Sequence, residues 1–247
     1  MRYLVLSDIH SNLEALEACL VDAEIRGYDR TLILGDVVGY GSDPNAVIAR
    51  VQALAPSAIV RGNHDKAACG IDDAEGFNAV ARHAAIWTAD ALTEGSRHWL
   101  RAMPAGPILV DSTIEVCHGS PLDEDDYIFD ELDGLRALRA SERPLCLFGH
   151  THCPIAYELS GDADEAVVLR GVQRMELRSG SRFLINPGAV GQPRDGDPRA
   201  AYTVVDVAAA QCTVELVRVP YPFRITQRKI LEAGLPDALA RRLATGR

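Results

Sequence analysis

The chain has 247 residues, of which 47% are hydrophobic, with a formal net charge of −10 and a pI near 5.1. This hydrophobic content can build a core, which excludes a disordered chain, and the acidic balance argues against long nucleic acid or an anionic membrane as the main partner. No apolar run approaches the roughly 20 residues of a membrane helix, and polar residues come too early for a signal peptide. We expect a cytoplasmic protein whose six cysteines, none in a CxxC pair, are free thiols.

The first 65 residues alternate between strand and helix patterns. Apolar runs predict buried strands, and amphipathic segments predict the two helices between them. The expected strands are 3–9, 31–38 and 57–65, and the expected helices are 12–27 and 43–54. This β-α-β-α-β order is typical of a parallel sheet covered by helices.

The rest of the chain is first helical, over 75–103, and then rich in strands. We expect a hairpin at 108–120, a helix near 130–140, and strands at 144–152, 155–161, 166–171, 182–192, 200–207 and 212–220. An amphipathic helical tail at 224–243 is interrupted at 234–236. Because neither a repeat nor a linker is visible, we predict one domain over 1–247.

Polar residues gather at the ends of the predicted strands. Five of the seven histidines fall in the motifs SDIH, GNHD, CHGS and GHTH. Residues two apart on a strand face the same way, so Asp8 should point with His10, and His150 with His152. In open α/β sheets, ligands bind beyond the carboxyl ends of the strands. Imidazole, carboxylate and amide donors suit Mn, Fe, Zn, Co or Ni better than calcium, so the sequence predicts a metal site.

The ordered motifs D-x-H, GD, GNHD, H and GHTH resemble the calcineurin-like metallophosphoesterase superfamily, and within it the compact bacterial and archaeal phosphodiesterase-like group. The resemblance runs from Asp8 to the segment 186–202. It implies an α/β fold that is a four-layer α-β-β-α sandwich, with two mixed β-sheets flanked by helices and a dinuclear metal site at the strand ends. It also implies two divalent metal ions, with manganese expected first and Fe, Zn, Co or Ni as alternatives.

The resemblance further implies a role for each motif residue. The ligands of the first metal would be Asp8, His10, Asp36 and His152. The ligands of the second would be Asp36, Asn63, His118 and His150, with Asp36 as the bridge. A shared hydroxide would attack phosphorus. The catalytic residues would be Asp36 and His64, the latter as general acid or transition-state stabiliser at the leaving group.

Substrate contacts are harder to assign from motifs. Arg194, in the loop GQPRDGD, and Asn63 are candidates for binding the phosphate, and a solvated loop residue is the alternative for Arg194. Gly39 and Tyr40 stand where the Ser/Thr protein phosphatases of the superfamily carry an aspartate and an arginine. This departure speaks against protein-phosphatase activity and leaves His64 without an assigned partner.

We therefore expect a metal-dependent phosphohydrolase for a small phosphodiester or nucleotide-type substrate. The alternatives are a phosphomonoesterase or phosphoprotein phosphatase, and a non-catalytic metal-binding scaffold. We expect neither long nucleic acid nor a membrane as partner. The strands near 155–170 leave two interpretations open, a hairpin that joins a homo-oligomer and an internal sheet edge.

Overall fold

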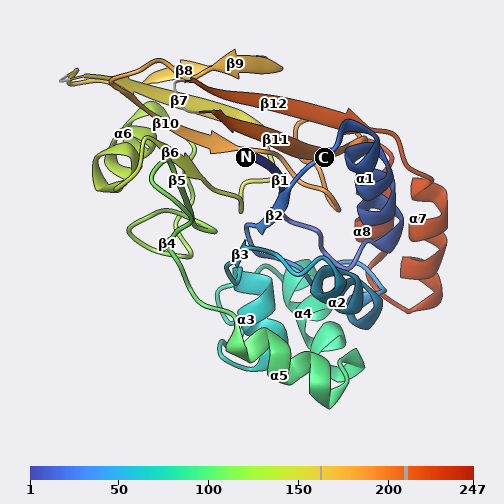
Figure 1. The fold of residues 1–247 in the computed structure, drawn as a ribbon. Coiled ribbons are helices and arrows are strands. Elements are labelled where there is room, and N and C mark those ends of the chain that lie inside the picture. Colours follow the sequence, from blue (N-terminus) through green and yellow to red (C-terminus); the bar gives the residue numbers. More distant parts are fainter. Residues whose placement is uncertain (162, 209–210) are drawn as a thin grey trace.

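The computed structural model describes residues 1–161, 163–208 and 211–247, and its strands form two six-stranded sheets. The sheets pack against each other, and helices cover their outer faces (Figure 1). This arrangement is the four-layer sandwich with two mixed sheets that the resemblance implied.

The first sheet has the order β3-β2-β1-β11-β12-β9. Its N-terminal half is the expected parallel unit, with α1 (Leu13–Arg26) and α2 (Pro44–Ala53) as the connecting helices. The parallel strands are β1 (Arg2–Leu6), β2 (Arg30–Ile33) and β3 (Ala58–Ile59). The sheet continues with β11 (Ala200–Ala208), which pairs antiparallel to β1. Then come β12 (Gln211–Val219), antiparallel to β11, and β9 (Arg174–Glu176), antiparallel to β12.

The second sheet has the order β4-β5-β6-β10-β7-β8. The expected hairpin is present as β4 (Ile108–Leu109) and β5 (Ile114–Val116). Parallel to β5 lie β6 (Leu145–Leu147) and β10 (Ser181–Asn186). Next to β10 lies β7 (Ile155–Ser160), antiparallel to it, and β8 (Val167–Leu169) pairs antiparallel to β7. The predicted strands near 155–170 thus pair within the chain, with β8 at the edge of the sheet, and a contact with a second subunit stays a prediction.

Alternation along the strands produces the layers. In β1, Tyr3 and Val5 belong to the core between the sheets, whereas Leu4 and Leu6 pack under α1 and α2. On the second sheet, the helix α6 (Glu131–Ala140) covers the outer face. The buried core therefore holds both sheets in a fixed relation at the edge where their connecting loops meet.

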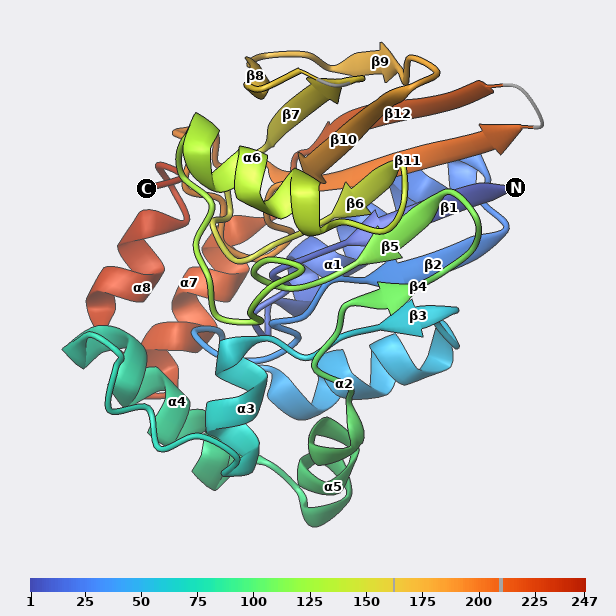
Figure 2. The ribbon, with the colours of Figure 1, turned by 90° about the vertical axis from the view of Figure 1, so that its left-hand side faces the viewer.

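Five further helices lie beside that edge. They are α3 (Asn63–Cys69), α4 (Ala79–Ala91), α5 (Glu94–Ala102), α7 (Phe223–Glu232) and α8 (Asp237–Arg242). The C-terminal α7 and α8 pack with α4 around Tyr40, and Figure 2 shows α8 next to α4. Among the described residues, no helix is both long and apolar enough to span a bilayer.

Several strands end earlier than the apolar runs predicted. β1 ends at Leu6 and β6 at Leu147, so Asp8, His10, His150 and His152 lie on loops. These four residues have positive φ values of 52°, 50°, 67° and 59°. The prediction that each pair points together because it lies on one strand is wrong, since left-handed turns replace the strand geometry.

Candidate metal centre

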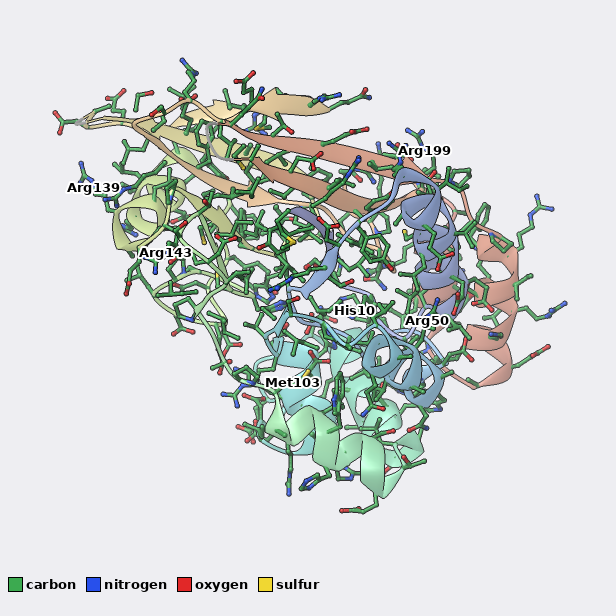
Figure 3. The ribbon with its side chains drawn as sticks, viewed as in Figure 1. His10, Arg50, Met103, Arg139, Arg143 and Arg199 are labelled. Carbon is green, nitrogen blue, oxygen red and sulfur yellow. The ribbon has the colours of Figure 1, made fainter. Side chains whose placement is uncertain are left out.

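Loops from both sheets converge at one place. Backbone hydrogen bonds join the loops after β1 and β2, from Asp8 N to Gly35 O at 3.1 Å and from His10 N to Asp36 O at 2.9 Å. In the second sheet, Gly149 N donates to His118 O at 2.8 Å. Figure 3 shows His10 near the middle of the molecule, between the sheets and the helices α3 to α5. The predicted ligand residues thus meet at a buried point.

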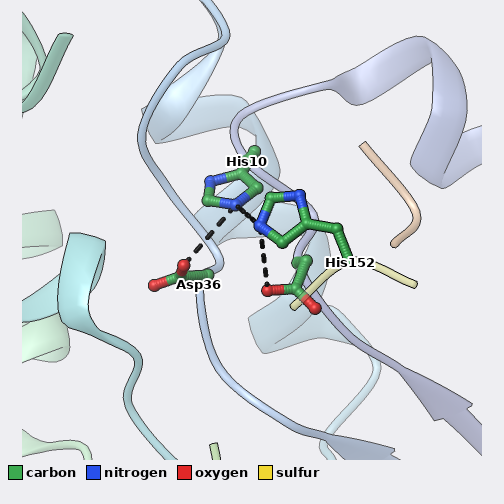
Figure 4. A group of neighbouring side chains, drawn as sticks. His10, Asp36 and His152 are labelled. Carbon is green, nitrogen blue, oxygen red and sulfur yellow. Dashed lines mark hydrogen bonds and ion pairs between the residues drawn. The ribbon is translucent and has the colours of Figure 1, made fainter. Parts of the chain in front are cut away.

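The first group of donor atoms comes from Asp8, His10, Asp36 and His152, whose ligand atoms all lie within 4.8 Å of one another. The Nε2 atoms of His10 and His152 are 3.0 Å apart (Figure 4). His152 Nε2 lies 3.4 Å from Asp8 Oδ1, and His10 Nε2 lies 3.5 Å from Asp36 Oδ2. Two facing imidazole nitrogens with carboxylates on either side form a set that one cation can satisfy.

The second group comes from Asp36, His118 and His150, again within 4.8 Å of one another. Asp36 Oδ2 lies 3.5 Å from His118 Nε2, the same distance that separates it from His10 Nε2. One carboxylate oxygen therefore faces both groups. Asn63, the first residue of α3, brings a buried side-chain oxygen to the same region.

Unpartnered donor atoms mark these groups as suited to cations. Within the described part of the chain, four buried ligand atoms have no hydrogen-bond partner, namely Asp36 Oδ2, Asn63 Oδ1, His118 Nε2 and His150 Nε2. A buried polar atom without a partner costs about 1–3 kcal/mol. A concentration of such atoms around two points is expected where metal ions complete the structure, so the residues fit the group that the resemblance implied.

The other ring nitrogens orient the histidines. Nδ1 of His10 contacts Val38 O at 3.0 Å, Nδ1 of His118 contacts Leu34 O at 2.7 Å, and Nδ1 of His152 contacts Gln192 O at 2.6 Å. A carbonyl accepts, so Nδ1 carries a proton in each ring and Nε2 is the nitrogen that can serve as the ligand atom. Only the fold reveals these carbonyls as partners, because they come from neighbouring loops.

The pKa values of the ligand side chains are shifted in different directions. Burial raises the pKa of Asp8 to about 7 and lowers the pKa of His150 to about 3. Burial also opposes protonation of His118, but the adjacent Asp36 carboxylate outweighs it and raises the pKa of His118 to about 10. Without a cation, His118 therefore holds a proton that a metal at Nε2 has to displace.

Two motif glycines are required because neighbouring atoms occupy the space that a Cβ atom would need. A Cβ atom on Gly62, in GNHD, would lie 2.1 Å from Asp36 Oδ1. On Gly149, in GHTH, it would lie 2.2 Å from Ser7 Oγ. These glycines let the backbone pass directly behind the two ligand aspartates, Asp36 and Asp8.

His64 has aromatic neighbours. Its ring centroid lies 4.2 Å from that of Tyr40 and 4.7 Å from that of Phe77, and its backbone N–H donates to Asp36 Oδ1 at 2.9 Å. Its buried Nδ1 has no hydrogen-bond partner among the described residues. The carboxylate of the next residue, Asp65, does not partner this ring, because it accepts from the backbone N–H groups of Val38 and Gly62. Burial lowers the pKa of His64 to about 4, so the neutral imidazole prevails at pH 7.

A cavity of about 320 Å³ opens next to His64. Its wall includes three predicted functional residues, Asn63, His64 and Arg194. Tyr127 also lines it, and this ring stacks on His150 at a centroid distance of 3.8 Å. The structure therefore places Arg194 beside the two groups of ligand residues, called the metal groups below, and not in a solvated loop remote from them.

Comparison with known proteins decides the family. The family model of the calcineurin-like phosphoesterase superfamily domain matches residues 1–210. The chain belongs to the calcineurin-like phosphoesterase superfamily. A relative of this phosphoesterase, an uncharacterized protein (MJ0912) of Methanocaldococcus jannaschii, is 33% identical over 251 residues, covering 98% of the chain and 97% of the relative.

Two solved structures resemble this phosphoesterase over its whole length. A metallophosphoesterase from Sphaerobacter thermophilus has 40% identity and a TM-score of 0.86, with 100% of each chain covered. A hypothetical protein (PH1004) from Pyrococcus horikoshii has 22% identity and a TM-score of 0.80, covering 100% of this chain and 98% of the other, and it supports the fold alone. The predicted superfamily and fold are confirmed, and the chain is a hydrolase of the metallophosphoesterase class.

Several residues that line the cavity of this phosphoesterase could not be found from the sequence, among them Phe77 and Arg242. Phe77 precedes α4, and Arg242 ends α8, and both line the cavity with His64. Neither lies in a motif. The amphipathic pattern of the tail predicted the helices but carried no signal for the surface against which they pack.

Proposed function

We propose that this phosphoesterase uses two divalent cations to hydrolyse a small phosphodiester or nucleotide-type substrate. The observation that carries the proposal is the position of Asp36 Oδ2, 3.5 Å from Nε2 of both His10 and His118. A single oxygen between two donor groups suits a bridging ligand. When bound, such cations supply positive charge at the phosphate and lower the pKa of the attacking water.

The ligand sets proposed for the two cations follow the two groups. The first comprises Asp8, His10, Asp36 and His152, and the second comprises Asp36, Asn63, His118 and His150. Asp36 is the catalytic carboxylate because it positions both cations. Asn63 adds a neutral oxygen, which leaves the site less negative for an incoming phosphate and places an amide beside it.

We assign His64 to the leaving group. It lies between Asp36 and the cavity, and its low pKa favours a neutral ring that donates a hydrogen bond over a ring that delivers a proton. Its contribution is then stabilisation of the charge that develops on the leaving oxygen. The aromatic rings of Tyr40 and Phe77 hold the imidazole in place.

The cavity supports a substrate larger than phosphate itself. Its volume of about 320 Å³ lies within the range of small-ligand sites, roughly 300–1,000 Å³. Arg194 on its wall can bind a phosphate oxygen, and Tyr127 and Phe77 offer apolar surface for a second ester group. This combination favours a diester or nucleotide over a simple monoester.

The test is hydrolysis by protein that has been stripped with a chelator and reloaded with manganese, with Fe, Zn, Co and Ni in parallel. The panel contains bis-p-nitrophenyl phosphate, p-nitrophenyl phosphate, diadenosine tetraphosphate and a phosphopeptide. We expect turnover of the diester or dinucleotide that is lost in Asp36→Asn but kept in His98→Ala, an exposed histidine on α5. Turnover of monoesters alone would make the protein a phosphatase, and two bound metals without turnover would make it a scaffold.

We also propose that the protein works in the cytoplasm. All six cysteines are free thiols, and the Sγ atoms of Cys117 and Cys146 lie 3.7 Å apart without a disulfide bond, as suits a reducing compartment. The proposed partners are small phosphate esters, with neither long nucleic acid nor a membrane, and self-association stays a prediction.

A further inference from the structure

Three arginines line the cavity, Arg194, Arg242 and Arg247, and the first two share neutral partners. Arg194 and Arg242 both donate to Gln192 Oε1, at 3.2 and 2.9 Å. Arg194 also donates to the hydroxyl of Tyr40 at 3.2 Å. Their guanidinium carbons lie 5.6 and 6.0 Å from the centre of the Tyr40 ring, so two cationic groups crowd one aromatic side chain.

No carboxylate in the described chain forms an ion pair with either guanidinium. Nε of Arg194 and Nε of Arg242 are buried and lack a hydrogen-bond partner in that same part of the chain. Burial and the charge of Arg194 lower the pKa of Arg242. Two partly buried like charges with spare donors are unfavourable by themselves and become favourable once an anion binds between them.

The residue before Arg242 on α8 shows the contrast. Arg241 is exposed, with 73% of its side chain accessible, and pairs with Asp237 at 2.7 Å. It is an ordinary surface arginine with a carboxylate one helical turn away. Arg242 differs because α8 packs against Tyr40 and turns this side chain toward the cavity.

The arginine pair lies one aromatic ring away from the metal groups. Tyr40, which both guanidinium groups approach, has its ring centroid 4.6 Å from that of His10 and 4.2 Å from that of His64. The backbone N–H of Arg194 donates to His152 O at 3.3 Å. An anion on the pair would therefore be an immediate neighbour of a phosphate held at the metal groups.

The acidic segment DEDD at 123–126 does not cancel this field. Glu124 accepts two hydrogen bonds from Arg61, both at 2.9 Å, and a further one from Lys66 at 3.2 Å. Asp125 also pairs with Lys66. These carboxylates are neutralised on the side of α3, so they do not repel an anionic substrate as strongly as an unpaired run would.

We propose that Arg194 and Arg242 form a subsite for a second phosphate group of the substrate, adjacent to the phosphate that is cleaved. The preferred substrate class is then a nucleotide-type polyphosphate, in which a phosphoanhydride places a second anion directly beside the first. Guanidinium groups match phosphate oxygens with paired N–H donors, and Nε of each arginine supplies a donor that is otherwise unused. This inference rests on the proposed function, because the subsite is defined by its position next to the phosphate that the proposed reaction cleaves.

The experiment compares diadenosine tetraphosphate with bis-p-nitrophenyl phosphate, which has a single phosphate, using the manganese-loaded full chain. The variants are Arg242→Gln and its matched control Arg241→Gln. We expect Arg242→Gln to lower kcat/KM on the tetraphosphate by about tenfold to hundredfold. The factor by which kcat/KM falls on the monophosphate diester should be at least about ten times smaller. Arg241→Gln should match the wild type on both substrates.

A second readout is independent of turnover. Calorimetry measures the binding of inorganic pyrophosphate to chelator-treated protein, and we expect weaker binding in Arg242→Gln than in Arg241→Gln. Equal losses on the two substrates would assign Arg242 to the cleaved phosphate and overturn the subsite, as would unchanged kinetics. If the wild type cleaves neither substrate, the proposed function fails, and the pyrophosphate titration alone decides the subsite.

Discussion

Asp8, His10, Asp36, His150 and His152 all adopt positive φ, between 50° and 67°. A side chain other than glycine in the left-handed region costs about 1–3 kcal/mol, and five such residues adjoin one another here. Hydrogen bonds between neighbouring loops hold this conformation, as between His10 N and Asp36 O. The fold therefore maintains strained backbone where ligand atoms have to converge, which is expected at a functional centre and not in a structural core.

For His64, the structure predicts a loss of rate without loss of metal. Replacement by alanine should lower kcat by about 10²- to 10⁴-fold, because the leaving oxygen loses its hydrogen-bond donor. Metal content, measured by elemental analysis, should stay at the wild-type level, since the side chain of His64 is outside both ligand groups. His83→Ala, on the exposed side of α4, is the control, and normal turnover in His64→Ala would remove this residue from the mechanism.

Protonation of His118 makes metal binding pH-dependent. The pKa of His118 is raised to about 10, so the ring is charged at pH 7 and becomes neutral only as the pH rises through that value. Cation binding at pH 7 should release about one proton from this ring and weaken as the pH falls. Titrations of manganese in buffers of different ionisation enthalpy measure the proton count, and binding without proton release would show that His118 is not a ligand.

At the scale of elements, strand ends and glycines set the geometry. Gly62→Ala should reduce metal affinity and stability, because the new Cβ would meet Asp36 Oδ1 at 2.1 Å. The φ of Gly62 is −105°, so a steric conflict and not backbone strain causes the loss. Gly95→Ala in α5 has open space around its Cβ and should instead stabilise the helix by about 0.5–1 kcal/mol. Thermal unfolding with and without manganese compares the two variants, and equal behaviour would contradict the close approach.

The same strand ends explain which parts of the fold could be predicted from sequence. Buried runs identified β1, β2, β6, β10, β11 and β12, because apolar periodicity survives without knowledge of tertiary contacts. It could not locate where each strand stops, since residues after Leu6 and Leu147 are also buried but turn to left-handed conformations. β9 was missed because its three residues, Arg174–Glu176, have no apolar pattern and form a strand only by pairing with β12.

At the scale of the whole molecule, the candidate site combines motifs that sequence reveals with surfaces that it does not. The structure brings the predicted ligands together in one region, and their division into two sets came from the family resemblance that the ordered motifs carry. The Nδ1 contacts to Val38, Leu34 and Gln192 and the approach of Arg242 depend on how distant segments pack. Such contacts have no local signature, so Asn63, His64 and Arg194 on the cavity wall could be predicted from their motifs and loop, whereas Phe77 and Arg242 could not.

The metal groups also tie the two sheets together, which leads to a prediction about stability. Asp8 and Asp36 follow strands of the first sheet, and His118 and His150 follow strands of the second. A cation bound only by the folded chain stabilises it by about 2.7 kcal/mol at a hundredfold excess over Kd. For a chain of this size, manganese should raise Tm by roughly 5 to 10 °C.

This stabilisation should disappear in Asp36→Asn, because the one oxygen that faces both groups then loses its charge. In the metal-free protein, Asp36→Asn should lower Tm less than it does in the metal-loaded protein, since the substitution also reduces charge repulsion among the buried carboxylates. Differential scanning calorimetry with manganese and with chelator measures both effects. If chelation left the wild-type Tm unchanged while metal was lost, the cations would contribute to chemistry alone, and the packing of the two sheets would hold the ligand geometry without them.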